Sequence, residues 1–103
     1  MSNVVEIVNF KLATGFTIND FLQSNEQMNQ FLQDQEGMLY RSLCETEQGE
    51  FIDIVYWDSM ENAHKAQQAF YTSELCQAFA QCIDKESIKL EHIKVIASLG
   101  CEG

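Results

Sequence analysis

The sequence contains no proline and few basic residues: six against sixteen acidic ones, which gives a net charge of −10. This charge repels phosphate backbones, and the aromatic signatures of RNA-binding domains are also missing, so we expect no nucleic-acid partner. No apolar run approaches the roughly 20 residues of a membrane span, so we expect no membrane partner either. The N-terminal stretch MSNVVEIVNF lacks the basic start and cleavage site of a secretory signal, which predicts a cytoplasmic protein.

Metal-ligand spacing is also lacking. The four cysteines, Cys44, Cys76, Cys82 and Cys101, form no C-x-x-C pair, and the chain has only two histidines. Cys76 and Cys82 are six residues apart on a predicted helix, which places their Cα atoms about 9 Å apart along the axis and beyond disulfide reach. We therefore predict free thiols, no metal site and no cofactor.

Strand and helix patterns alternate along the chain. β-branched residues indicate the strands, apolar residues at helical spacing indicate the helices, and Gly49 supplies the turn of a hairpin. The predicted elements are a strand over 3–12, a helix over about 18–35, strands over 38–46 and 51–57, a broken helical segment over about 58–83, and a strand over 87–97.

The order β-α-β-β-α-β predicts a fold of the α+β class. It is the ferredoxin-like, split-βαβ pattern, in which a four-stranded antiparallel sheet carries its helices on one face. We expect a single domain over residues 1–103, with a frayed tail at 98–103.

Two helix starts are marked by capping residues. Thr17 is a good N-cap, and Asp20 at the third helical position suits the positive end of the helix dipole. Asp58 stands where the third strand gives way to the second helix, and Glu61 follows three residues later. This pattern predicts that Asp58 caps the second helix in a capping box.

Both faces of the predicted sheet are apolar. In the third strand, for example, one face carries Phe51, Val55 and Trp57, and the other carries Ile52, Ile54 and Tyr56. The helices of one protomer cover only one face, and the other would leave an apolar patch larger than soluble monomers usually tolerate. We therefore expect a homodimer whose subunits pack through their open sheet faces.

Several features together resemble a known family. They are the βαββαβ order, the tryptophan that closes the third strand, the W-D-S-x-E-x-A step into the second helix and the L-E-H of the last strand. Over about residues 3–97 the chain resembles the dimeric α+β-barrel superfamily, and more narrowly its antibiotic-biosynthesis-monooxygenase-like branch. The resemblance implies two ferredoxin-like subunits in a closed barrel, each with a pocket between sheet and helices. Members include cofactor-independent oxygenases of aromatic polyketides, haem-degrading enzymes and proteins without known activity, so the fold alone does not transfer the chemistry.

The haem-degrading relatives use an asparagine on the first strand, a tryptophan on the third and a histidine on the second helix. Asn9 and Trp57 match in kind, but the position nine residues past the tryptophan holds Ala66. His64 lies about 200° away from that position around the helix. We therefore predict that His64 is a surface histidine and does not bind haem.

His92 and Asn9 are the candidate catalytic residues, and both lie in the middle of predicted strands. His92 shares its face with Leu90 and Ile88, and a half-buried imidazole can move a proton or orient a substrate hydroxyl. The alternative is a core histidine bonded to backbone or to a cross-strand acid such as Glu6. Asn9 either holds a substrate carbonyl or enolate, or bonds neighbouring backbone.

Four further residues are candidates for a ligand pocket. Trp57 is a pocket wall or a core residue, and Tyr40, opposite it in the expected hairpin register, extends an aromatic wall. Arg41, opposite Tyr56 in that register, either pairs with an acid across the dimer or holds an anionic ligand. Asp53 is either near the sheet edge or a base with a raised pKa.

These features favour a small-molecule-binding homodimer. The first hypothesis is a cofactor-independent monooxygenase acting on an aromatic or enolisable substrate, with a dry pocket, His92 as base and Asn9 as oxyanion donor. The second is a non-catalytic dimerisation or stress-linked binding module whose interior is filled by its own side chains, and the third is haem degradation. A ligand-sized cavity between sheet and helices distinguishes the first hypothesis from the second.

Overall fold

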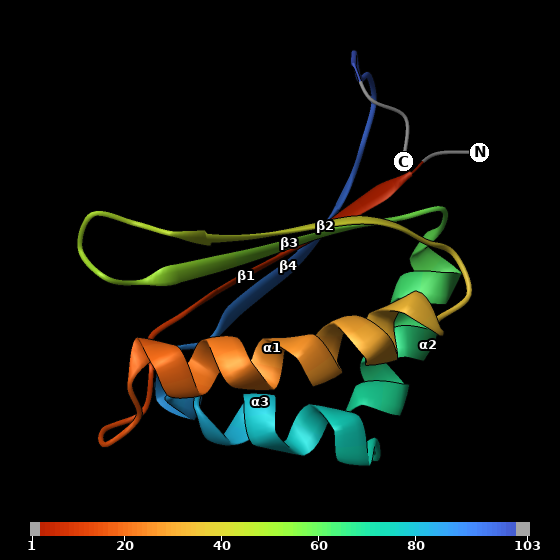
Figure 1. Ribbon diagram of the computed structural model, residues 1–103. Helices are drawn as coiled ribbons and strands as arrows, with labels where there is room; N and C mark the ends of the chain where they lie inside the picture. The colour runs from red at the N-terminus through yellow and green to blue at the C-terminus, as the bar shows by residue number, and fades with distance from the viewer. Residues whose placement is uncertain (1–2, 101–103) are drawn as a thin grey trace.

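The computed structural model describes residues 3–100 and has the predicted ferredoxin-like architecture. Four strands form one antiparallel sheet in the order β2-β3-β1-β4. The helices lie against one face of this sheet, and in the described part of the chain none covers the other (Figure 1). The elements in order are β1 (Val4–Phe10), α1 (Ile18–Gln33), β2 (Met38–Glu45), β3 (Phe51–Trp57), α2 (Met60–Phe70), the 3-10 helix η1 (Glu74–Cys76), α3 (Gln77–Gln81), the 3-10 helix η2 (Lys85–Ser87) and β4 (Lys89–Lys94).

Helix α1 begins as predicted. The Thr17 hydroxyl accepts a hydrogen bond from the Asp20 N–H at 3.1 Å, and the Asp20 carboxylate accepts one from the Thr17 N–H at 2.9 Å. This capping box satisfies two of the N–H groups that a helix start leaves without partners. The helix then buries one face, formed by Phe21, Met28 and its neighbours, against the sheet.

The predicted cap of α2 is wrong by one residue. The hydroxyl of Ser59, not the carboxylate of Asp58, accepts the hydrogen bond from the Asn62 N–H. The backbone N–H of Asp58 is instead bound to the carbonyl of Gly37 at 2.8 Å, which holds Asp58 at the strand end. Gly37 has a φ of +85°, and a Cβ there would collide with Asp58 and Asn62, so this junction needs glycine.

The hairpin register also differs from the prediction. A β-bulge between Met38 and Tyr40 shifts the pairing by one residue, so that Tyr40 lies opposite Tyr56 and Arg41 opposite Val55. Because side chains alternate between faces, this shift turns Tyr40 to the open face and Arg41 to the helical face. Tyr40 is 53% exposed, and its ring centroid is 6.3 Å from that of Tyr56.

The core lies between the sheet and the helices and is rich in phenylalanine. Phe10 and Phe51 from the sheet meet Phe21 of α1 and Phe79 of α3, with ring centroids 4.9–6.3 Å apart. Rings at these distances gain stabilisation beyond the apolar area that they bury.

The cysteines that the structure describes are free thiols, as predicted. Cys76 and Cys82 are buried and Cys44 is exposed, whereas Cys101 lies outside the described residues. Between residues 3 and 100, no helix combines the length and the apolar character that crossing a membrane requires. The last strand is shorter than the predicted 87–97, and residues 95–99 have no regular secondary structure.

Candidate functional site

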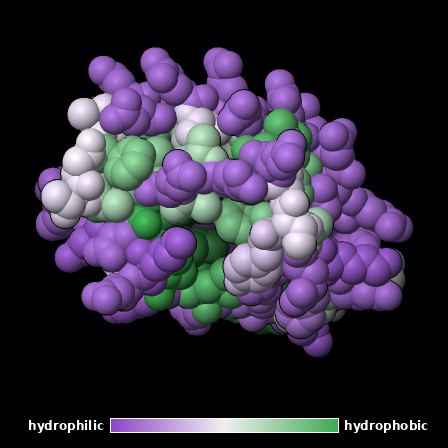
Figure 2. Space-filling model, turned by 90° about the horizontal axis from the view of Figure 1, so that it is seen from below, coloured by the Kyte–Doolittle hydropathy of each residue, from purple (hydrophilic) through white to green (hydrophobic). Residues whose placement is uncertain are grey.

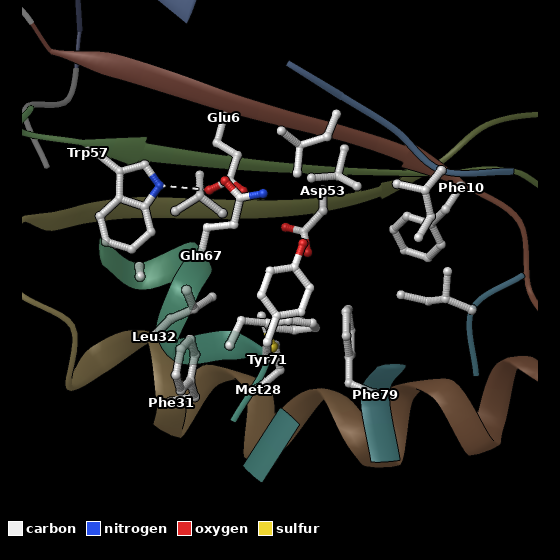
Figure 3. A pocket seen from close by; sticks show the side chains of 17 residues that line it. Glu6, Phe10, Met28, Phe31, Leu32, Asp53, Trp57, Gln67, Tyr71 and Phe79 are labelled. Carbon is white, nitrogen blue, oxygen red and sulfur yellow. Dashed lines mark hydrogen bonds between the residues drawn. The ribbon is translucent and has the colours of Figure 1, made fainter. Parts of the chain in front are cut away.

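A cavity of about 160 Å³ lies between the helical face of the sheet and the helices (Figure 3). Its floor and walls are mostly apolar, and the polar side chains among its lining residues are Glu6, Asp53, Gln67 and Tyr71. Tyr71 is 69% exposed and Ile88 is 42% exposed, so these two residues mark the rim. Figure 2, which views the molecule from the helical side, shows hydrophilic side chains around a hollow with hydrophobic residues inside it.

Glu6 is the acidic residue that faces this cavity from β1. Its neighbours on the same face of the strand, Val4, Val8 and Phe10, are apolar. The indole N–H of Trp57 donates a hydrogen bond of 3.0 Å to Glu6 Oε1 (Figure 3). Trp57 is itself buried and lines the cavity, so it is both a core residue and a pocket wall.

Burial is the main influence on the Glu6 carboxyl group, and it raises the pKa. The hydrogen bond from Trp57 lowers the pKa in part, and the nearby negative charge of Asp53 raises it again. A carboxyl group with a raised pKa is a better general base than an exposed one, because it holds a proton more firmly once it has taken it.

His92 lies on β4, directly opposite Glu6 in the β1–β4 pairing. Its Nε2 atom is buried, has no hydrogen-bond partner within residues 3–100, and lies 3.7 Å from Glu6 Oε2. This distance is too long for a hydrogen bond, so the two groups are neighbours without being bonded. Burial lowers the pKa of His92, and the adjacent His64 lowers it further. His92 does not line the cavity itself.

His64 is exposed on α2, as predicted, but it is not isolated. Its ring packs edge-on against the ring of His92, with the centroids 5.0 Å apart. Ala66, at the position where the haem-degrading relatives place a histidine, is buried and lines the cavity. The helix therefore turns His64 away from the cavity and presents a methyl group to it.

Asp53 and Arg41 form a buried ion pair. Arg41 Nε and Nη2 donate to the two oxygens of Asp53 at 2.9 and 2.8 Å, and Nη1 donates to the side-chain oxygens of Asn25 and Asn29. The guanidinium carbon also lies 5.5 Å from the centroid of the Phe79 ring. The bulge explains this pairing, because Arg41 would otherwise point to the open face.

The ion pair changes the interpretation of both residues. Asp53 lies on the interior strand β3, not at the sheet edge, and its carboxylate oxygens are both bound by Arg41. Arg41 is bound by groups of its own chain, so its guanidinium does not face the cavity as a free anion site. Asp53 lines the cavity, and the pair joins β2, β3 and α1.

The structure does not bring Asn9 to His92. Asn9 alternates with Val8 and Phe10 along β1 and therefore points to the open face, whereas His92 lies on the helical face with Glu6. Tyr40 is on the open face as well, because of the bulge. Asn9 and Tyr40 are thus excluded from the cavity of their own protomer, which corrects the predicted pairing of Asn9 with His92.

Sequence comparison gives no relatives for this chain: no family model matches it, and no curated protein matches it. Its three-dimensional structure does match solved structures. A candidate antibiotic biosynthesis monooxygenase from Bordetella bronchiseptica matches with a TM-score of 0.78 and 16% identity, covering 94% of this chain and 100% of that one. SnoaB, a cofactor-independent oxygenase from Streptomyces nogalater, matches with a TM-score of 0.67 and 14% identity, covering 97% of each chain.

The fold is that of the antibiotic-biosynthesis-monooxygenase-like proteins. A dimeric ferredoxin-like protein from an uncultured marine organism also shares this fold, with a TM-score of 0.66 and 10% identity over 98% of this chain and 94% of that one. At such identities the likeness establishes the architecture and says nothing about the reaction.

The cavity is small compared with pockets that hold large ligands such as a macrocycle. Pockets for drug-sized ligands are typically about 300–1,000 Å³, whereas this cavity has about 160 Å³. Within residues 3–100, no group of three or more His, Cys, Asp or Glu side chains is placed to hold a metal ion. The volume of the cavity favours a small organic ligand over a haem macrocycle.

Proposed function

We propose that the cavity binds a small aromatic or enolisable molecule and that the protein is a cofactor-independent monooxygenase with Glu6 as its base. The observation that carries this proposal is the Glu6 carboxyl group, which lies at the wall of an apolar cavity and has a pKa raised by burial. The oxygenase activity named for SnoaB, which shares the fold, supports the proposal. The open cavity weighs against a binding module whose interior is filled by its own side chains.

The first step is removal of a proton from the substrate. The Glu6 carboxylate takes the proton from an acidic C–H or O–H group and leaves an enolate or phenolate. Gln67, half-buried at the cavity wall, supplies an amide N–H to the developing oxyanion, the role expected from the sequence for Asn9. Figure 3 shows the Gln67 side chain reaching towards Glu6.

His92 is a positioning residue in this scheme. Its buried Nε2 atom lies 3.7 Å from Glu6 Oε2, and burial favours the neutral imidazole by lowering the pKa of His92. A neutral ring at this position adds no positive charge that would lower the pKa of the Glu6 carboxyl group.

Dioxygen is the co-reactant of the second step. The substrate carbanion attacks dioxygen, a carbon–oxygen bond forms, and the proton held by Glu6 converts the peroxide anion to a hydroperoxide. The oxygen–oxygen bond then breaks with loss of water. A CH₂ group and O₂ thus become C=O and H₂O, so atoms and electrons balance without any other oxidant.

Aerobic turnover of phloroglucinol, a neutral one-ring enol, and of anthrone, a three-ring ketone, tests this function. The proposal expects dioxygen uptake matched by formation of the corresponding quinone with at least one of the two, in protein freed of metals and flavins. Absence of uptake with both substrates, under conditions where the folded protein is intact, would contradict it.

The homodimer is part of the same proposal. The open face carries a row of half-buried apolar side chains, among them Val5, Ile7, Ile52 and Ile54. The neighbour described as a dimeric ferredoxin-like protein supports a second copy as the cover for this face. Two such sheets packed face to face would give each protomer a closed back wall behind its cavity.

Replacing Ile54 with lysine is expected to convert the dimer into monomers, because it places a charge in the middle of the apolar face. Light scattering should give twice the 11.8 kDa of one chain for the wild type and about that single mass for the variant. Leu22→Lys, at a 50%-exposed position on α1, is the matched control and should remain dimeric. A monomeric wild type at micromolar concentration would refute the dimer.

A further inference from the structure

We propose that the natural substrate is a one-ring phenol or enol that enters the cavity uncharged, with no carboxylate or phosphate group. This rests on the proposed site, and it concerns the size, the charge and the hydrogen bonds that the cavity imposes on any occupant.

The volume limits the occupant to one ring. An apolar cavity of about 150 Å³ in another protein accommodates benzene, and this cavity has about 160 Å³. Its wall includes Phe10, Trp57 and Phe79, which are buried and packed into the core on their far sides. Since packed cores yield little to an oversized group, two or three fused rings would have to displace these side chains.

The charge of the lining excludes anions. Two acidic residues, Glu6 and Asp53, line the cavity, and none of the described lining residues is lysine, arginine or histidine. Arg41 is not a lining residue, and its guanidinium group is already bound to Asp53, Asn25 and Asn29. A carboxylate on the ligand would therefore be buried without a positive partner, which weakens its binding. The net charge of −10 adds long-range repulsion.

The polar atoms of the cavity wall favour an occupant that carries a hydroxyl group. Glu6 Oε2 receives no hydrogen bond from the described part of the chain, whereas both oxygens of Asp53 are occupied by Arg41. Gln67 and Tyr71 are the other polar lining residues, and in Figure 3 the Gln67 side chain reaches towards Glu6. A phenol or enol hydroxyl can donate to Glu6 and accept from Gln67 at once, which neither an ether nor a hydrocarbon can do.

Trp57 provides a direct measurement of binding. It is the sole tryptophan of the chain, so the indole N–H gives one resolved signal in a nitrogen–proton NMR spectrum, and that N–H is bonded to Glu6. Three probes separate the requirements: phloroglucinol, its carboxylated derivative trihydroxybenzoate, and anthrone. Phloroglucinol should shift the signal to saturation, trihydroxybenzoate should bind at least about tenfold more weakly, and anthrone should leave the signal unchanged.

A cavity-filling variant shows that the shift arises at this site. Ala66→Leu adds bulk to the cavity wall and should abolish the phloroglucinol shift, while Gln68→Leu, at an exposed position on the same helix, should retain it. The same spectra report whether each variant is folded. Equal binding of trihydroxybenzoate, saturable binding of anthrone, or no response to phloroglucinol would each overturn the inference. Oxidation of anthrone would overturn the inference and leave the proposed function standing. Saturable binding of phloroglucinol with no dioxygen uptake from either phloroglucinol or anthrone would contradict the proposed function and leave the size and charge limits of the cavity standing.

Discussion

Replacing Glu6 with glutamine is expected to lower kcat for phloroglucinol oxidation by about 10²- to 10⁴-fold, the usual contribution of a positioned general base. Glutamine keeps the shape of the side chain and an oxygen that can accept the hydrogen bond from Trp57, but it cannot take a proton. Dioxygen uptake measures kcat, and the indole N–H signal of Trp57 shows whether the substrate is still bound. The loss should therefore appear in kcat with the fold preserved.

Two further variants sharpen this result. Glu26→Gln makes the same chemical change at an exposed position on α1 and should leave kcat unchanged. His92→Gln should reduce kcat less than Glu6→Gln does, and it should also change the pH dependence of kcat, since it removes a titratable group next to the base. If Glu6→Gln retains more than about half of the wild-type kcat, Glu6 is not the base.

Replacing Arg41 with methionine is expected to reduce the free energy of unfolding by about 3–5 kcal/mol, because it leaves the Asp53 carboxylate buried without its partner. The side chains of the pair are only 7% and 8% exposed, so solvent screens them little. The variant also loses the hydrogen bonds to Asn25 and Asn29. Urea unfolding followed by circular dichroism, at one protein concentration throughout, measures the difference.

The double variant Arg41→Met/Asp53→Leu is the matched control. It removes both charges together, and replacing a whole buried pair by apolar groups often costs far less than removing one partner. We expect the double variant to recover most of the lost stability. A cost below about 1 kcal/mol for Arg41→Met alone would mean that the pair behaves like an exposed surface ion pair.

The fold could be predicted from the sequence because its signals are local. Thr17 and Asp20 mark the start of α1, and Gly49 marks the turn of the β2–β3 hairpin. The order of elements then leaves few topologies, since crossovers have one favoured hand. The apolar character of both sheet faces is equally plain from the alternation of residues 51–57.

The placement of Tyr40 and Arg41 could not be predicted because it depends on one irregularity. The bulge after Met38 shifts the hairpin register by one residue, and a shift of one residue exchanges the two faces. Tyr40 consequently lies away from the expected pocket wall, and Arg41 reaches Asp53. No proline or glycine stands at the bulge, so the sequence contains no residue that predicts the shift.

Glu6 was missed for a different reason. The sequence suggests it only as a structural partner for His92, although it lies on the apolar face of β1 between Val4 and Val8. A lone acid among inward-facing apolar residues is itself the signal, because burying a carboxyl group needs a partner or a purpose. Asn9, the more conspicuous polar residue of the same strand, points the other way.

The titration of the Glu6 carboxyl group is the most direct test of the site, because the proposed base depends on a desolvated carboxyl at the cavity wall. Carboxyl-carbon NMR follows it, with Glu6→Gln identifying the signal. Burial should raise the midpoint of the titration clearly above the ordinary glutamate pKa of about 4.3. A midpoint at or below that ordinary value would show a solvated carboxylate, and the proposed base would have to be abandoned.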